Sequence, residues 1–199
     1  MKLYDAAVSG NCHKVRMFLS MLTLDHEVVP VSLPDMEQKT PEHMARNPIG
    51  SVPVLEDGAA TIYDSQAILV YLARAHGNDD WLPTDAVGQA KVQQWLSFAV
   101  NELWNGPALA RAKLLFGRDI DLPRAQAMAK ISLGIMDRRL GDSDWLALDQ
   151  PTIADIACYP YSALAEEGEI SLAPYDALRA WFKRMEGLPG YVTMPGLGG

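Results

Sequence analysis

Two short motifs contain the residues whose types and spacing are best suited to binding a ligand. Pro53 stands where a buried strand should begin, and proline is normally confined to strand starts, edges and bulges because it has no N–H group. The backbone N–H and C=O of Val52 are therefore predicted to stay free for a short extended peptide. A cis Val52–Pro53 peptide bond is one expectation for this loop, although only ~5–6% of X-Pro bonds in folded proteins are cis. Asp64 and Ser65 open an apolar helical pattern, and helix N-termini bind anions. Together these features predict a small acidic peptide as the ligand.

Residues 1–76 show the alternation of strand and helix patterns that must position these motifs. β-Branched runs predict strands, apolar spacing of three and four residues predicts helices, and Asp57-Gly58 predicts a hairpin turn. The expected strands are Lys2–Asp5, His26–Val31, Val52–Leu55 and Ala60–Tyr63, and the expected helices are Cys12–Leu24, a short irregular one around Pro41–Arg46, and Asp64–His76. The order βαβ and then ββα predicts an α/β domain with a four-stranded mixed sheet.

The rest of the chain predicts helices only. Residues 77–85 form a polar linker, and residues 86–199 are expected to be an all-α helical domain. Its expected helices are Val87–Phe116 with a kink at Gly106-Pro107, Pro123–Leu140, Ile153–Glu166 and Tyr175–Glu186. Thr152 and Asp155 match a capping box, and a structural role is predicted for Asp155 because a buried carboxylate must be hydrogen-bonded. The tail from Leu188 is expected to be irregular, and whether it closes over a ligand cleft stays open.

The composition is that of an ordinary globular protein and excludes several classes of function. The chain has 199 residues, 49% of them hydrophobic, and its net charge of −8 argues against nonspecific nucleic-acid binding, which needs a basic surface. No apolar stretch reaches the ~18 residues of a membrane-spanning helix, and the N-terminus lacks a signal-peptide pattern. Cys12 and Cys158 form no C-x-x-C motif, which favours a reducing, cytoplasmic setting. The histidines are not paired at helical spacing, so no metal site is predicted.

Five motifs occur in one order along nearly the whole chain. They are Ser9–Arg16, Asn47–Leu55, Asp64–Ile68, Trp81–Pro83 and Thr152–Asp155. With the predicted order of strands and helices, they resemble the cytosolic glutathione transferases. The resemblance implies a thioredoxin-like domain over residues 1–76 that binds glutathione as co-substrate. It also implies that the helical domain over residues 86–199 lines a pocket for a small hydrophobic electrophile, and that the protein is a homodimer.

The first turn resembles the serine-type classes of that family and some bacterial relatives. The resemblance implies that Ser9 donates a hydrogen bond to the sulfur of glutathione and that Asn11 helps to hold it, while the helix dipole favours the thiolate. Without the other motifs, a turn with a helix cap is the preferred interpretation of Ser9-Gly10-Asn11; the motifs at Val52-Pro53 and Asp64-Ser65 favour the catalytic one. Cys12 is considered as a thiol of lowered pKa that forms a mixed disulfide with glutathione, although a buried, structural Cys12 is preferred. Val15 excludes a C-x-x-C dithiol mechanism.

The remaining motifs imply how the tripeptide is held along its length. Val52 pairs with the cysteinyl unit through its backbone, in a geometry that Pro53 sets. Ser65 and the helix N-terminus bind the γ-glutamyl carboxylate, and Asp64 binds its ammonium group. A plain Asp-Ser helix cap is the simpler alternative for the last pair.

The chain departs from the family pattern in two of these contacts. Asp64 is shorter by one methylene than the glutamate that is more frequent there, and Ser51 stands where some serine-type classes place a lysine. The glycyl carboxylate of glutathione is then left to Gln38 and Lys39, which are otherwise ordinary exposed residues.

The electrophile pocket is expected along the first long helix of the helical domain. Its candidate residues are Leu103, Trp104, Pro107, Ala108 and Arg111, with Tyr159 from a later helix. Aromatic residues at helical spacing also fit a packed core, and Arg111 fits an ion pair as well as it fits an anionic co-substrate.

Two other functions compete with conjugation of glutathione to an electrophile. One is disulfide reduction or peroxidase chemistry with glutathione, acting through Cys12. The other is a binding or regulatory protein that keeps the fold without turnover, for which the altered contacts at Ser51 and Asp64 leave room.

Overall fold

The N-terminal part of the chain forms a four-stranded mixed sheet, as predicted. The computed structural model describes residues 1–197. The strands β1 (Lys2–Asp5), β2 (Glu27–Pro30), β3 (Val54–Asp57) and β4 (Ala60–Tyr63) lie in the order β2-β1-β3-β4. β1 runs parallel to β2 and antiparallel to β3, and β3 and β4 form the predicted hairpin.

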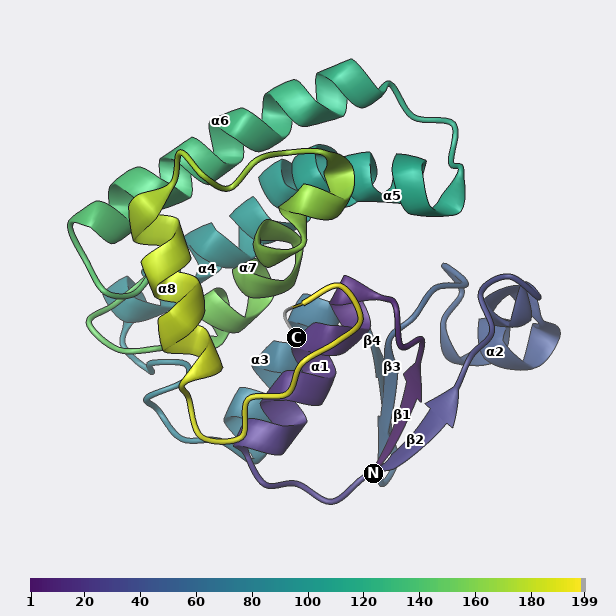
Figure 1. The fold of residues 1–199 in the computed structure, drawn as a ribbon. Helices are drawn as coiled ribbons and strands as arrows, with labels where there is room; N and C mark the ends of the chain where they lie inside the picture. The colour runs from purple at the N-terminus through teal and green to yellow at the C-terminus, as the bar shows by residue number, and fades with distance from the viewer. Residues whose placement is uncertain (198–199) are drawn as a thin grey trace.

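Three helices flank this sheet (Figure 1). α1 (Gly10–Met21) and α3 (Ser65–Ala75) lie together on the side that faces the helical part of the chain, and α2 (Pro41–Arg46) lies on the other side. α1 begins two residues before the expected Cys12. Ser9 is its N-cap, with Oγ accepting the backbone N–H of Cys12 at 3.3 Å. The cap places the Ser9 hydroxyl at the helix start.

The third strand begins later than predicted, and the delay leaves Val52 outside the sheet. β3 starts at Val54, which pairs with Tyr4, because Pro53 has no N–H to give to a ladder. The Val52–Pro53 peptide bond is cis, the form considered from the sequence.

The first long helix of the C-terminal part is a run of three helical segments. α4 (Ala86–Phe98) continues into a π-helical segment (Ala99–Ala108) and then into α5 (Leu109–Phe116). The disturbance predicted at Gly106-Pro107 takes the form of this wider helix, which accommodates a proline without an N–H donor. Gly106 also permits a close approach of the next helix, since a Cβ there would lie 2.8 Å from Cα of Ala129.

The other helices pack around one central helix. α6 (Leu122–Gly141) and α8 (Asp176–Glu186) lie on the outside, and α7 (Ile153–Ala163) is buried at every position from 153 to 162. A short 3-10 turn (Ala165–Gly168) follows α7, where the sequence predicts a continuation of the helix. Asp155 forms the predicted capping box with Thr152, and it also accepts hydrogen bonds from Leu146 N and Trp181 Nε1, which confirms its structural role.

The C-terminal tail packs against α1 (Figure 1). Val192 O lies 2.7 Å from Nε2 of the buried His13, and the hydroxyl groups of Tyr191 and Tyr159 lie 2.9 Å apart. A side chain at Gly190 would meet the backbone of α1, since its Cβ would lie 2.7 Å from Cα of Met21. Up to residue 197, the tail therefore covers the side of α1.

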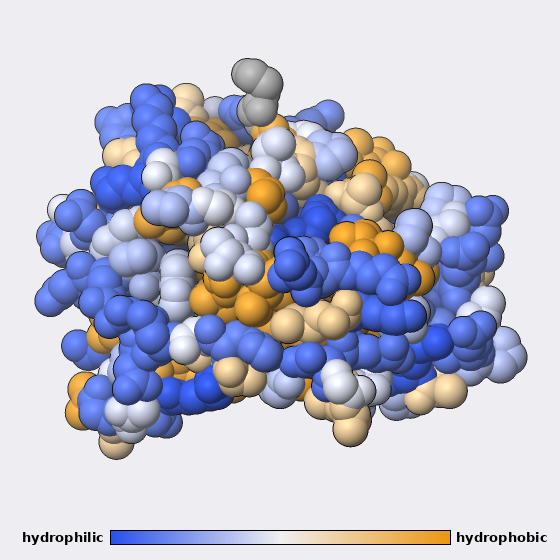
Figure 2. All heavy atoms as spheres, turned by 90° about the horizontal axis from the view of Figure 1, so that it is seen from below, coloured by the Kyte–Doolittle hydropathy of each residue, from blue (hydrophilic) through white to orange (hydrophobic). Residues whose placement is uncertain are grey.

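One face of the molecule presents both hydrophilic and hydrophobic side chains. The face seen in Figure 2 is mostly hydrophilic, with hydrophobic patches bordered by polar side chains. None of the helices within residues 1–197 is both long and apolar enough to cross a bilayer.

Candidate active site

A cavity of about 440 Å³ lies where three segments distant in the sequence meet. These are the turn before α1, the loop that leads to β3, and the π-helical segment with α5. Of the residues predicted for the site, the cavity is lined by Ser9, Asn11, Gln38, Lys39, Ser51, Val52, Trp104, Ala108 and Arg111. Most of the residues that the sequence assigns to two separate subsites thus share one cavity.

The first turn presents two polar side chains to this cavity. Ser9 Oγ accepts the Cys12 N–H, which leaves its own hydrogen free to be donated. Asn11 Oδ1 accepts hydrogen bonds from Lys14 Nζ at 2.8 Å and from Ser65 Oγ at 3.4 Å. Because both acceptor positions of Asn11 face inward, its amide nitrogen is left for another partner.

Cys12 does not line the cavity, contrary to its assignment as a glutathione contact. Its side chain has no exposed surface, and Sγ accepts a hydrogen bond from Ala6 N at 3.5 Å. Burial raises the pKa of the Cys12 thiol to about 12, the opposite of the lowered pKa considered from the sequence. The desolvation of a thiolate in this core outweighs the benefit of the helix N-terminus, so the structural interpretation of Cys12 holds.

The loop before Pro53 brings Val52 to the cavity wall and leaves its backbone groups without partners. Among residues 1–197, neither the N–H nor the C=O of Val52 has a hydrogen-bond partner. The preceding carbonyl, of Ser51, is instead bound by Asn47 Nδ2 at 2.9 Å and lies 3.0 Å from His43 Nε2. Asn47 and His43 are both buried, and the sequence signals no such role for His43.

The loop residues predicted for the glycyl carboxylate also reach the cavity. Lys39 is exposed, and its Nζ donates to Ile49 O at 2.8 Å. Gln38 Oε1 is a buried oxygen without a partner among the described residues. Ser51 lines the same side, with Oγ accepting from Asn47 Nδ2 at 3.1 Å.

Asp64 lies at a second, smaller cavity that adjoins the first, whereas the predicted contact Ser65 is buried and lines neither cavity. Asp64 caps α3 through Oδ1, which accepts the N–H groups of Gln66 and Ala67. Its φ of 72° is a strained conformation for a residue other than glycine, of the kind that costs about 1–3 kcal/mol and recurs at functional sites. The cavity, of about 230 Å³, is lined by Asp64, Gln66, Lys14, Ala99 and Val100, together with Asn11 and Trp104. Asn11 and Trp104 line both cavities and so join them.

Lys14 is a site residue that sequence reasoning missed. It is 1% exposed, and in the described chain Nζ forms no ion pair with a carboxylate. Burial lowers the pKa of Lys14 to about 8. Its position three residues after Asn11, on the buried side of a helix, was the available signal, because side chains at that spacing meet.

The helical domain supplies the opposite wall. Trp104, Ala108 and Arg111 line the cavity as predicted. Arg111 is paired with Glu167, and its Nη1 donates to Val8 O at 2.9 Å, next to Ser9. The arginine therefore ties the helical domain to the turn that carries Ser9.

Three residues predicted for the electrophile pocket do not line it. Tyr159 has no exposed surface, and its hydroxyl group bonds to Glu186 and Tyr191. Leu103 and Pro107 are buried among the helices. Tyr161 lines the cavity in place of Tyr159, and its ring packs edge-on against Trp104. Because α7 is buried on all sides, its apolar pattern did not reveal which tyrosine faces the cavity.

Within residues 1–197, no three His, Cys, Asp or Glu side chains gather in a way that could hold a metal ion.

Comparisons with known proteins agree with this architecture. Residues 3–80 match the model of the glutathione S-transferase N-terminal domain, and residues 118–189 match that of the C-terminal domain. Glutathione S-transferase 4 of Zea mays is 30% identical over 95% of this chain and 89% of its own, and the disulfide-bond oxidoreductase YfcG of Escherichia coli is 29% identical over 92% and 89%.

Solved structures are similar over the same extent. A glutathione S-transferase from Pseudomonas fluorescens superposes with a TM-score of 0.90 at 31% identity, covering 98% of both chains. A glutathione transferase homologue from Drosophila mojavensis, solved with bound glutathione, superposes with a TM-score of 0.85 at 31% identity over 94% of this chain and 88% of its own. The order of strands and helices, the two matching domain models and these relatives together show that the chain is an enzyme of the glutathione S-transferase family.

Proposed function

We propose that this enzyme conjugates glutathione to a small hydrophobic electrophile, with the sulfur held by Ser9 and Asn11. In this proposal residues 1–76 bind glutathione and residues 86–199 supply the wall against which the electrophile lies. The observation that carries it is the convergence of the free Val52 backbone, the Ser9 hydroxyl and the Asn11 side chain on one cavity. Relatives in the family support glutathione as the co-substrate.

The tripeptide is proposed to bind in three parts. Val52 pairs with the cysteinyl unit as a one-residue extension of a strand, which directs the thiol toward Ser9. The γ-glutamyl end enters the second cavity, where the Asp64 carboxylate takes its ammonium group. Its carboxylate is proposed to approach the backbone N–H of Ser65 at the start of α3. The glycyl carboxylate points to Lys39 and Gln38 at the other end of the main cavity.

The chemistry needs only hydrogen-bond donors at the sulfur. A thiol of ordinary pKa near ~8.5 is mostly protonated at neutral pH, and lowering its pKa by about two units requires ~2.7 kcal/mol of preference for the thiolate. One hydroxyl donor to a charged acceptor supplies about 1.5–3 kcal/mol, and the amide of Asn11 and the start of α1 add to it. The proton leaves to water, and the thiolate forms a C–S bond as the electrophile opens its ring or expels its leaving group.

Replacing Ser9 tests this assignment. Ser9→Ala is expected to lower turnover at saturating glutathione by ten- to a hundredfold while glutathione binding by calorimetry changes little. Ser9→Ala also removes the helix N-cap, which lowers the free energy of unfolding by about 1 kcal/mol. Ser9→Thr keeps both the hydroxyl group and the cap, and it should therefore retain turnover. Ser20→Ala, on the same helix, is the matched control. Turnover that is unchanged in Ser9→Ala would refute the role of Ser9.

The competing function through Cys12 has no support from the geometry. The thiol lies behind the cavity wall with a raised pKa, so it meets neither condition for attack on a disulfide. Cys12→Ser is expected to leave conjugation within twofold of the parent enzyme.

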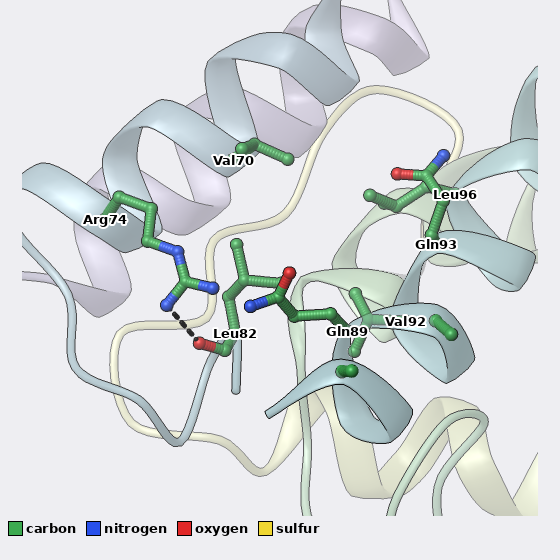
Figure 3. Close-up of a pocket in the computed structure, with 9 residues that line it drawn as sticks. Val70, Arg74, Leu82, Gln89, Val92, Gln93 and Leu96 are labelled. Atoms are coloured by element: carbon green, nitrogen blue, oxygen red, sulfur yellow. Dashed lines mark hydrogen bonds between the residues drawn. The ribbon is translucent and has the colours of Figure 1, made fainter. Parts of the chain in front are cut away.

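We further propose that two copies associate across α3 and α4. A groove of about 470 Å³ runs between these helices, with Val70, Leu82 and Leu96 among its lining residues (Figure 3). Val87 at the start of α4 is 65% exposed beside it. A second copy that covers this face would bury both apolar features.

The oligomeric state in solution tests this interface. Val87→Asp is expected to shift sedimentation from dimer toward monomer. Ile131→Asp, on α6 and also 65% exposed, is the matched control and should leave the dimer intact. A parent enzyme that sediments as a monomer would exclude the interface.

A cytoplasmic location is proposed from the cysteines. Cys12 and Cys158 are both free and buried, as expected in a reducing compartment. Fractionation of the native host, with the protein recovered outside the cytoplasm, would contradict it.

A further inference from the structure

Lys14 is a buried charged residue next to the proposed site, and the proposed chemistry gives it no role. Its side chain is buried under Asn11, and Nζ donates to Asn11 Oδ1 at 2.8 Å. Lys14 lines only the smaller cavity, whereas Asn11 lines both. Any effect of Lys14 on the sulfur in the larger cavity must therefore pass through a neighbour or through its electric field.

We propose that Lys14 is a positioning residue that fixes the orientation of the Asn11 amide, so that Asn11 presents its NH2 group to the glutathione thiolate. The inference rests on the proposed function and deepens it. In this proposal the buried ammonium group of Lys14 makes the Asn11 amide, which could present either end, a hydrogen-bond donor to the thiolate.

The argument starts from the hydrogen-bonding chemistry of the two groups. A carboxamide has a donor end and an acceptor end of nearly the same size, so it can present either end to a ligand. A lysine ammonium group has three donors and no acceptor, so only Oδ1 of Asn11 can face it. Oδ1 is thereby held inward and the NH2 group is turned away from Lys14. If the amide were reversed, an oxygen would face the thiolate and repel it.

The surroundings of Lys14 reinforce this orientation. The Gln66 amide satisfies its neighbours best with its oxygen toward Lys14 Nζ at 3.3 Å and its nitrogen toward Asp64 Oδ1 and Ser65 Oγ. Ser65 Oγ then accepts from Gln66 and donates its own hydrogen to Asn11 Oδ1 at 3.4 Å. Two donors thus converge on the oxygen of Asn11.

Among residues 1–197, no ion-pair partner neutralises the ammonium group. The titratable groups that face it are Asp64 at the start of α3 and two residues of α7, Cys158 and Tyr161. The ring centroid of Tyr161 lies 5.3 Å from Lys14 Nζ. Asp64 uses Oδ1 to cap α3, and in the described chain no carboxylate forms an ion pair with Lys14. Neutral amide oxygens are therefore its main acceptors, which is the condition for the ammonium group to orient them.

The test measures the ionisation of glutathione bound to the intact enzyme, by the ultraviolet absorbance of the thiolate as a function of pH. Lys14→Met keeps the length of the side chain and removes every donor. It is expected to leave about tenfold less thiolate at a given pH below the midpoint, and Asn11→Ala is expected to do the same. In the double variant the loss should equal that of Asn11→Ala alone, since Lys14 acts through Asn11. Lys130→Met, which removes an exposed lysine of α6, should change nothing.

The outcomes separate this inference from the function on which it rests. A loss in Lys14→Met that persists undiminished in the Asn11→Ala background would show that the lysine acts by its field, and would overturn the inference. An unchanged thiolate in Lys14→Met would also overturn it, while Ser9→Ala still tests the proposed function. Absence of any bound thiolate in the parent enzyme would overturn both. If Lys14→Met does not fold, Lys14→Gln replaces it, because a neutral amide no longer dictates which end of Asn11 faces it.

Discussion

Replacing Lys14 by methionine should make the enzyme more stable. Burial lowers the pKa of Lys14 from 10.5 to about 8, so the folded state holds this proton less tightly than the unfolded state does. That difference corresponds to a cost of about 3 kcal/mol at neutral pH. Methionine has a similar length and no charge, so the variant escapes this cost. The variant also loses the hydrogen bond to Asn11 Oδ1, which destabilises it by about 1 kcal/mol. The net gain is about 2 kcal/mol, or roughly 4–8 °C in Tm for a chain of this size.

The pH dependence provides the sharper version of this prediction. Between pH 8 and 10.5 the unfolded chain binds the Lys14 proton and the folded chain does not, so the stability of the parent enzyme rises across this window. Below pH 8 the cost is present in full. The advantage of Lys14→Met should therefore be constant below pH 8 and should shrink toward pH 10.

The assay is urea unfolding at a series of pH values, with Lys130→Met as the control for loss of an exposed lysine. The control should stay within ~0.5 kcal/mol of the parent enzyme. If Lys14→Met is destabilised by 1 kcal/mol or more at pH 7, in a variant that still unfolds in one step, the reasoning about an unpaired buried ammonium group is wrong.

Three further predictions concern groups away from the sulfur. Asp155→Ala removes the acceptor for Leu146 N and Trp181 Nε1, and should cost about 3 kcal/mol in urea unfolding; a cost below 1 kcal/mol would contradict the capping network. Burial lowers the pKa of His13 to about 4, so the unfolded state takes up this proton first as the pH falls from 6.5 to 4, and stability should be lost across that window in the parent enzyme but less so in His13→Gln. Burial raises the pKa of both cysteine thiols, so neither Cys12 nor Cys158 should react with a disulfide reagent until urea unfolds the chain; one rapidly reacting thiol in the native enzyme would refute this.

Local sequence patterns were enough to predict the fold. The spacing of apolar residues, the Asp-Gly turn and the order of elements predicted the mixed sheet and the helices. A proline without an N–H group predicted a free Val52 backbone, although the strand itself was expected to begin at Val52 and begins at Val54. Thr152 and Asp155 were recognised as a capping box because both members lie within one turn of helix. The boundaries proposed for the two domains stay a prediction.

The candidate site was predictable where its residues lie in short motifs that turns and helix starts position. Ser9, Asn11 and Val52 are of this kind, and all three line one cavity. Tyr159 was assigned wrongly because α7 is apolar on every side, so its periodicity could not show which face meets the cavity and which meets α8. Tyr161, two residues further on, lies on the cavity side.

The sequence by itself determined which side chains stand at the start of α1. Only the tertiary structure decided their ionisation and reactivity. Cys12 and Lys14 stand two residues apart beside the same helix start, and the helix N-terminus taken by itself would lower the pKa of the thiol. The packing of α7 and α3 over this turn removes water from both. The thiol becomes inert, and the ammonium group is left to face the oxygen of Asn11. Desolvation depends on segments more than fifty residues away, and a local pattern carries no information about them.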